Sequence, residues 1–326
     1  MIVIVVLLIT TILITLMSVN IPIHSREGLS NARPDLTTTT STDLRNVKEY
    51  NQKQSHSHKY GIALLMRKPE DLPLWLKHHR ELGISKFYIR MEDTPGWEEF
   101  LKAQPDIEYE IAESDATNNY ETLQKRQIAF VNQSLRKAEK DGIEWLFHID
   151  ADELLEGNLA LLNTISPEIK TITMTNVEAV YDGTEKTCFD ARRFKRCQEK
   201  GANCRSYANG KSAGRVIRPT NQGGMVTDTP KTTLKGPHNF AYAGDHIKYN
   251  KQIDFNELHV LHFDSCSFGA WAEKFRHLNK GTTNKDKTPF PYYEESKKIA
   301  SSAYTTYMKT VSSEDNDTDD IIYVRK

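Results

Sequence analysis

The sequence predicts an α/β fold with a mostly parallel central sheet, preceded by an N-terminal membrane helix and a flexible stem. An uncharged apolar run opens the chain at residues 2–19. From Tyr60 onward, segments of strand character alternate with segments of helix character. The strand segment at residues 144–149 ends directly in carboxylates. Repeated strand–helix units of this length favour parallel pairing, with helices on both faces of the sheet.

The composition is that of an ordinary globular protein. The chain has 326 residues, a formal net charge of −1 and 38% hydrophobic residues. That length suffices for one large or two smaller domains. The balanced charge gives no reason to expect a nucleic-acid partner.

The N-terminal run contains no charged residue from position 2 to position 19. As a helix it would span ~27 Å, about the hydrocarbon thickness of a bilayer. A cleaved signal peptide is the alternative, but the run is longer than a typical signal core and no basic segment precedes it. We therefore expect an uncleaved signal anchor at residues 1–20. The first basic residue, Arg26, follows the run, so the positive-inside rule does not support a lumenal C-terminus.

Two polar segments flank the predicted folded domain at residues 59–311. Residues 21–58 are rich in Thr, Ser, Gln and His, which predicts a flexible stem. Residues 312–326 are acidic and polar, which predicts a frayed tail.

The folded domain begins with a strand–helix–strand pattern. The apolar run Tyr60–Met66 predicts a buried strand, and Gly83 ends a helix predicted at residues 70–82. The apolar stripe of that helix consists of Leu72, Trp75, Leu76, His79 and Leu82. A second strand at residues 86–91 and a short helix at residues 96–103 follow.

The later elements become harder to assign. We predict strands at residues 107–112, 144–149 and 171–180, and a long helix at residues 121–140. Residues 181–257 have weak periodicity and carry no assignment, although they are too long for a single loop.

The cysteines and glycosylation sequons bear on the cellular compartment. There is no Cys-x-x-Cys pair, which argues against a zinc site. In a secretory lumen, two disulfides, or one disulfide and free thiols, would be expected. Sequons begin at Asn132, within a predicted helix, and at Asn316. The four cysteines are Cys188, Cys197, Cys204 and Cys266.

The carboxylates after the strand at residues 144–149 are the main candidate site. Asp150 and Asp152 point to the same side of an extended chain, at the sheet edge where ligands bind. Two like charges this close repel unless a cation lies between them. Oxygen ligands with an open coordination sphere suit Mg²⁺ or Mn²⁺ shared with a phosphorylated substrate. A solvated turn is the alternative interpretation.

Two other polar residues could contact a nucleotide. Asp93 follows a predicted strand and could reach a ribose, although a simple turn residue would look the same. Gln127 shares an apolar helix stripe with Leu123 and Val131. It could reach a nucleotide or brace the carboxylate strand, or it could be a buried amide satisfied by backbone groups.

Four motifs resemble those of family 2-like and family 92-like glycosyltransferases, in the same order and across roughly residues 60–280. They are WLKHHRELGISKFYI at 75–89, DADE at 150–153, NGKSAGR at 209–215, and LHF at 261–263 followed by SFGAWAEKF at 267–275. Where those families usually have Lys-Asn-Glu after the first strand, this chain has RKPE at 67–70.

The resemblance implies a GT-A fold, with a metal at the end of the Asp-x-Asp strand. It implies inverting transfer of a sugar from a nucleotide-sugar, with a UDP-linked donor expected, to a hydroxyl of a glycan, glycoprotein or glycolipid. A Golgi or other secretory-pathway membrane, with a lumenal catalytic domain, is the expected location. Mn²⁺ or Mg²⁺ held by Asp150 and Asp152 would neutralise charge on the leaving nucleoside diphosphate. Lys211 or Arg215 could add to that effect, or could belong to a solvated basic loop.

The resemblance also implies a third metal ligand and a general base. His262 is the expected ligand and His259 the alternative, because residues three apart on a strand face opposite ways. Either could instead be an ordinary structural histidine. Asp264 and Asp245 are candidates for the carboxylate that accepts the proton of the acceptor hydroxyl.

Two other functions stay open at this point. The chain could be another divalent-metal enzyme, such as a phosphodiester hydrolase, or a non-catalytic carbohydrate-binding surface protein on the same fold. A hydrolase usually needs more carboxylate or His ligands than the sequence shows. A protein that had lost catalysis would be expected to lack one of the two Asp residues, and both are present.

Overall fold

The computed structural model describes residues 59–114, 120–197, 207–220, 222–269, 271–272, 274 and 321–325. All described residues belong to one compact unit, His56–Lys326. The predicted anchor, the stem up to residue 58 and residues 275–311 lie outside the described part. Within that part, no helix combines the length and the hydropathy needed to cross a bilayer.

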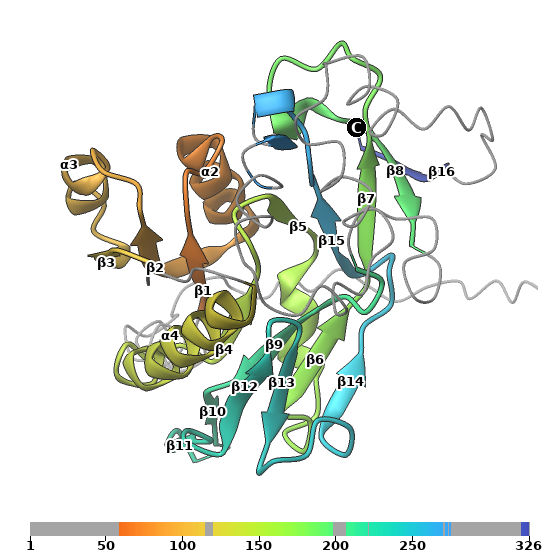
Figure 1. Cartoon of the computed structure of the whole chain (residues 1–326). Coiled ribbons are helices and arrows are strands. Elements are labelled where there is room, and N and C mark those ends of the chain that lie inside the picture. Colours follow the sequence, from red (N-terminus) through yellow and green to blue (C-terminus); the bar gives the residue numbers. More distant parts are fainter. Residues whose placement is uncertain are drawn as a thin grey trace, which may run out of the picture. The chain divides into compact units, whose positions relative to one another are not determined.

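The fold is α/β, and its largest sheet is mixed (Figure 1). Parallel pairing joins β1 to β2 and β4, β2 to β3, and β14 to β6, whereas β9 runs antiparallel between β4 and β6. The prediction of a mostly parallel sheet is therefore correct except for the reversed strand β9. The strands in spatial order are β14 (Asn250–Gln252), β6 (Thr171–Met174), β9 (Lys211–Arg215), β4 (Trp145–His148), β1 (Tyr60–Met66), β2 (Ile84–Glu92) and β3 (Ile107–Ala112).

A second sheet lies beside the first and provides one side of the candidate site. Its central strands β7 and β15 are parallel, and β5 pairs antiparallel with β15. In spatial order the strands are β16 (Ile321–Val324), β8 (Arg193–Arg196), β7 (Asn176–Val180), β15 (Leu258–His262) and β5 (Glu153–Gly157). Two antiparallel pairs complete the strands: β10 (Ile217–Pro219) with β11 (Met225–Thr227), and β12 (Thr232–Gly236) with β13 (Asn239–Tyr242).

Helices cover both faces of the large sheet, as predicted. Because side chains alternate along a strand, Ile62 and Leu64 of β1 pack with α2 (Leu72–Leu82), whereas Ala63 packs with α4 (Tyr120–Lys140). Figure 1 shows α2 and α4 on opposite sides of β1. A short helix, α3 (Glu98–Lys102), follows β2.

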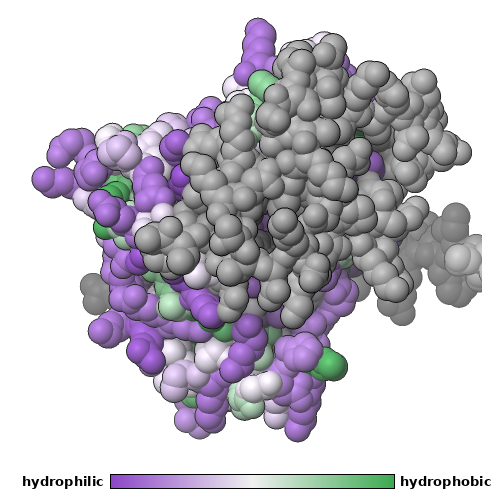
Figure 2. All heavy atoms as spheres, in the orientation of Figure 1, coloured by the Kyte–Doolittle hydropathy of each residue, from purple (hydrophilic) through white to green (hydrophobic). Residues whose placement is uncertain are grey.

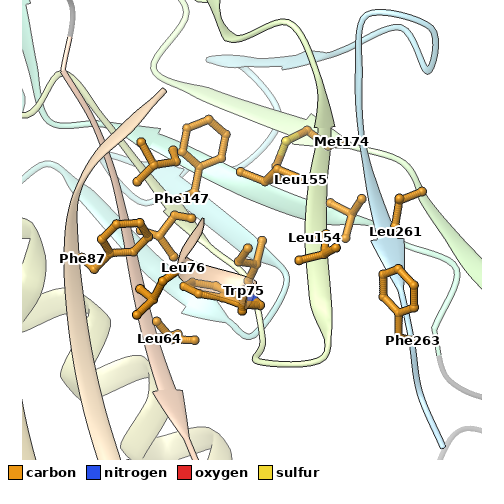
Figure 3. Close-up of a cluster of buried hydrophobic side chains, with 14 of the residues drawn as sticks. Leu64, Trp75, Leu76, Phe87, Phe147, Leu154, Leu155, Met174, Leu261 and Phe263 are labelled. Carbon is orange, nitrogen blue, oxygen red and sulfur yellow. The ribbon is translucent and has the colours of Figure 1, made fainter. Parts of the chain in front are cut away.

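The larger of the two hydrophobic clusters contains side chains from both sheets (Figure 3). Trp75 of α2 contributes a fully buried ring to this core and donates its indole N–H to the carbonyl of Glu153 at 2.8 Å. Helix α2 is therefore fixed directly to the turn that carries the carboxylates. Local signals set its ends: Asp71 accepts the N–H of Leu74 at 3.0 Å, and Gly83 adopts a φ of 112° after the last turn.

The second half of the chain corrects several predictions. The single strand predicted at residues 171–180 is two strands, β6 and β7, which separate at Thr175 and enter different sheets. The unassigned residues 181–257 contain β8 to β14, which have three to five residues each. A strand this short gives too few alternations to show a period. The predicted frayed tail is wrong at Ile321–Val324, which pairs with β8 as β16.

The first sequon is part of the packing. The side-chain amide of Asn132 donates to the carbonyl of Leu234 at 3.1 Å, and its oxygen accepts the N–H of Leu234 at 2.7 Å. Ser134 is fully buried. A glycan on Asn132 would remove these bonds, so this sequon does not support a lumenal location.

The described surface on the face shown in Figure 2 is largely hydrophilic.

The cysteines form disulfides in the described part of the chain. Cys188 is bonded to Cys266, which fixes the residues before β8 to the segment that follows β15. Cys197 is disulfide-bonded as well. This agrees with the expectation of at least one disulfide.

Candidate functional site

The carboxylate turn connects the two sheets. Strand β4 ends at His148, and residues 150–152 turn the chain into β5, which begins at Glu153. Since β4 is parallel to β1, this turn lies at the carboxyl edge of the parallel strands, where ligands bind in open α/β sheets. The carboxylate of Glu153 is fully buried and accepts the N–H of Asp150 at 2.7 Å.

A buried ammonium group lies against this turn. Lys211, at the start of β9, places its Nζ 2.5 Å from Asp150 Oδ2 and 3.3 Å from Glu153 Oε2. Its side chain is completely buried, and Nζ lies 5.3 Å from the ring centre of Tyr207, whose hydroxyl donates to Glu153. Burial opposes the charge of Lys211, but Asp150 and Glu153 outweigh it and raise the pKa of the ammonium. The ammonium therefore offsets the negative charge of the two carboxylates.

Asp150 is held on both of its oxygens. Besides the contact of Oδ2 with Lys211, Oδ1 accepts a hydrogen bond from Gln127 Nε2 of α4 at 3.1 Å. Burial would raise the pKa of Asp150, but Lys211 outweighs it and lowers that pKa. Of the interpretations left open for Gln127, the structure shows the brace to the carboxylate strand.

Three positions of the NGKSAGR segment are required by the packing around β9: Gly210, Ser212 and Gly214. Gly210 has a φ of 72°, and a Cβ there would overlap the carbonyl oxygen of Met174. Ser212 Oγ accepts the N–H of Phe240 at 2.9 Å. At Gly214 a Cβ would come within 2.5 Å of the Thr232 side chain. These contacts fix β9 between its neighbours and so set the position of Lys211.

His262 faces the second aspartate. Its Nε2 lies 3.6 Å from Asp152 Oδ2, and its Nδ1 donates to Glu178 Oε1 of β7 at 2.8 Å. His259 lies elsewhere: its Nδ1 donates to the carbonyl of Phe255 at 2.8 Å, and its ring stacks on that residue. The sequence argument that only one of the two histidines can face the carboxylates holds, and the structure places His262 there.

The charges around His262 favour the protonated form of its imidazole ring. Burial favours the neutral ring, but Glu178 and Asp152 outweigh it and raise the pKa of His262 well above its ordinary value. In turn, burial would raise the pKa of Asp152, but His262 outweighs it and lowers that pKa.

The Asp152–His262 pair fits a divalent metal, and Asp150 fits less directly. Neighbouring ligands in an octahedral shell with bonds of about 2.1 Å lie about 3 Å apart, so 3.6 Å requires only a small closure. The second imidazole nitrogen already bonds a carboxylate, as in most metal-bound histidines. Within the described residues, the ligand atoms of Asp150, Asp152 and His262 do not all lie within 4.8 Å of one another.

A different cluster does meet that distance, but its chemistry excludes it. Glu70, Cys188 and Cys266 place their ligand atoms within 4.8 Å of one another. Because Cys188 and Cys266 are joined in a disulfide, they offer no thiolate to a metal.

Asp264 lies next to the carboxylate turn. The N–H of Phe263 donates to the carbonyl of Asp152 at 2.8 Å, which brings the following residue, Asp264, close to the site. Asp264 Oδ1 contacts Lys274 Nζ at 2.6 Å, and Ser265 Oγ donates to the same oxygen at 3.1 Å. The buried Oδ2 has no hydrogen-bond partner among the described residues.

Arg215 does not belong to this site, contrary to the sequence-based expectation. It pairs across the sheet with Trp145, at the start of β4, whereas the carboxylates follow the end of that strand. Its guanidinium contacts Glu144 Oε1 at 2.7 Å and donates to the carbonyls of Ile165 and Ile169. The physical role of Arg215 is therefore to stabilise the opposite edge of the sheet.

The prediction of Asp245 as a candidate base is also wrong, because the structure places it away from the carboxylate turn. It follows β13 at the end where Tyr242 pairs with Thr232, and the Thr232 hydroxyl donates to the carbonyl of Arg215. Asp245 Oδ1 accepts the N–H groups of Ile247 and Lys248 at 2.8 and 2.9 Å. This exposed carboxylate stabilises a turn at the edge of the sheet remote from Lys211.

Asp93 lies at the carboxyl edge of β2 and organises the neighbouring loop. Its carboxylate accepts both the N–H and the hydroxyl of Ser114, and Arg67 Nε lies 3.5 Å away. Burial would raise the pKa of Asp93, but the bonds from Ser114 outweigh it and lower that pKa. The structure shows the role of Asp93 in stabilising the turn, whereas its contact with a ribose stays a prediction.

Three residues of the site were not predicted as site residues from the sequence: Glu153, Glu178 and Tyr207. Glu178 gave a usable signal, because a carboxylate within the apolar run of β7 must find a partner when buried. Tyr207 gave none, since it lies in the segment without clear periodicity.

Comparison with known proteins adds little to this geometry. No family model matches the chain, and no curated protein matches it. Among solved structures, the chain is similar to the crystal structure of HddC from Yersinia pseudotuberculosis, with 10% sequence identity and a TM-score of 0.26. The similarity covers 52% of this chain and 73% of that one, and carries no argument about fold or function.

Proposed function

We propose that this chain is a metal-dependent glycosyltransferase with a GT-A fold. It transfers a sugar from a nucleotide-sugar, with UDP as the expected nucleotide, to a hydroxyl of a glycan, glycoprotein or glycolipid, and inverts the anomeric configuration. One observation carries the proposal: the four motifs that resemble glycosyltransferases all contribute to one place. Trp75 bonds Glu153 directly after the turn, Asp150 and Asp152 belong to the turn, and Lys211 and His262 contact its carboxylates.

The residues of the site suit a nucleoside diphosphate leaving group. A divalent cation at Asp152 and His262 would neutralise negative charge developing on the diphosphate. Lys211 lies beside Asp150 and Glu153, already oriented and shielded from water, and offsets the negative charge with which these carboxylates would repel a diphosphate. Charge fixed in advance requires no reorganisation during the reaction, which is why such groups contribute strongly to catalysis.

Asp264 is the proposed general base. Inverting transfer requires a carboxylate that accepts the proton of the acceptor hydroxyl as that oxygen attacks the sugar. Asp264 Oδ1 is occupied by Lys274 and Ser265, so Oδ2 is the oxygen that would accept the proton.

The proposed location is a secretory-pathway membrane, such as the Golgi, with the catalytic domain in the lumen. The uncharged run at residues 2–19 supports the anchor, and the Cys188–Cys266 disulfide supports an oxidising compartment. Fractionation of the full-length protein tests this. We expect it to sediment with membranes after a carbonate wash, and recovery in the soluble fraction with an intact N-terminus would rule out the anchor.

The two histidines provide a test of the metal site. His262→Ala removes a proposed ligand, so the Mn²⁺ concentration that gives half of the maximal sugar transfer should rise by about 10-fold or more. His259→Ala removes a ring of similar burial that contacts Phe255 instead, and should leave that concentration nearly unchanged. A His262→Ala protein with a lower melting temperature but an unaltered Mn²⁺ requirement would show that the residue is structural.

A further inference from the structure

We infer that Glu178 is a positioning residue, which holds the His262 ring so that Nε2 faces Asp152 and a divalent cation. This inference rests on the proposed function. Nδ1 of His262 donates to Glu178 Oε1 at 2.8 Å, while Nε2 lies 3.6 Å from Asp152 Oδ2. The two ring nitrogens therefore have different partners, one from the neighbouring strand β7 and one from the carboxylate turn.

The backbone places the two side chains together. Strands β7 and β15 are parallel, and Glu178 is the direct register partner of His262. All five residues of β7 are buried, and Glu178 is 0% exposed in a strand that also contains Asn176, Val177, Ala179 and Val180. An apolar residue would pack here without the desolvation cost of a carboxylate. A buried carboxylate at this position is explained by a function that requires it to bond the histidine.

Loss of Glu178 should act on metal binding through His262. Without its partner on Nδ1, the ring can rotate and take Nε2 away from Asp152. A carboxylate on the second nitrogen also makes a histidine a better ligand, and removal of such a partner typically weakens metal binding by about 10-fold to 100-fold. Glu178 itself would not touch the substrate.

The test measures Mn²⁺ binding by full-length protein in detergent, from the electron paramagnetic resonance signal of free Mn²⁺, with no sugar donor present. Glu178→Leu should weaken binding by about 10-fold or more. Glu178→Gln keeps an oxygen that accepts the Nδ1 hydrogen, so its affinity should stay within about 3-fold of wild type. Glu178→Asp keeps the charge but withdraws the oxygen from Nδ1, so it should bind more weakly than Glu178→Gln.

Glu144→Gln serves as the matched control. Glu144 is also a buried carboxylate, but it pairs with Arg215 at the opposite edge of the sheet. Its substitution should leave the Mn²⁺ affinity unchanged even if the melting temperature falls.

Each outcome decides between the two claims. If wild type binds Mn²⁺ and the Glu178→Leu or Glu178→Asp protein binds it equally well, the inference is overturned and the proposed function stands. The same holds if Glu178→Asp binds more tightly than Glu178→Gln. If wild type itself binds no Mn²⁺, the metal-dependent function is overturned and this inference falls with it.

Discussion

Asp152→Asn should reduce Mn²⁺-dependent sugar transfer by about 100-fold or more while the fold stays intact. The side chain of Asp152 is 37% exposed and lies 3.6 Å from His262, whereas Asp150 is paired with the buried ammonium of Lys211. Asparagine keeps the size of the side chain but removes the charge that attracts the cation, which weakens the main electrostatic stabilisation of the leaving group. The backbone carbonyl that accepts the N–H of Phe263 is retained, so the turn should persist.

The measurement is initial-rate sugar transfer across a Mn²⁺ titration, with circular dichroism and melting temperature as checks on folding. Asp182→Asn is a suitable control, because it makes the same chemical change at a partly exposed carboxylate that bonds Thr184 in a surface turn. Its activity should equal that of wild type. Wild-type activity in Asp152→Asn, or undiminished wild-type activity in EDTA, would contradict the metal assignment.

Lys211→Met should destabilise the protein by about 3 kcal/mol, because it removes one partner of a buried ion pair and leaves the others in place. Glu153 is fully buried, so loss of the ammonium at 3.3 Å leaves its side chain without that compensating partner. Asp150 is partly exposed, so water would compensate part of its loss, and we therefore expect the lower end of the usual range. Sugar transfer should fall as well at temperatures where the variant remains folded.

Denaturant unfolding followed by tryptophan fluorescence measures the first effect. Lys251→Met is the matched control, since Lys251 is exposed on β14, and its substitution should change stability by less than about 0.5 kcal/mol. If Lys211→Met is as stable as the control, Lys211 does not neutralise the buried carboxylates as the structure indicates.

The first half of the fold could be predicted from the sequence because its elements are long and periodic. Strands β1 and β3 have the predicted bounds, and α4 begins one residue earlier than expected. Where β6 and β7 follow each other with only Thr175 between them, the sequence shows one continuous run. The division of that run between two sheets depends on tertiary pairing, which no local pattern encodes.

The site could be predicted where a residue departs from its local pattern. Gln127 within an apolar helix stripe and carboxylates directly after a buried strand are such departures. Lys211 and Arg215 show the limit of this approach: four residues of strand separate their Cα atoms by about 13 Å, so one basic residue reaches the carboxylates and the other reaches the opposite edge. The reversed direction of β9, which decides between them, could not be predicted from spacing alone.

The most direct test of the proposed function is turnover of nucleotide-sugars by the full-length protein in detergent. A panel of UDP-, GDP- and CMP-linked sugars would be incubated with Mn²⁺ or with EDTA, and the released nucleotide would be measured. We predict that at least one UDP-sugar is consumed with Mn²⁺, that EDTA abolishes this, and that Asp152→Asn protein loses it. Release of no nucleotide from any donor in Mn²⁺ or Mg²⁺, or equal release in EDTA, would contradict a metal-dependent glycosyltransferase.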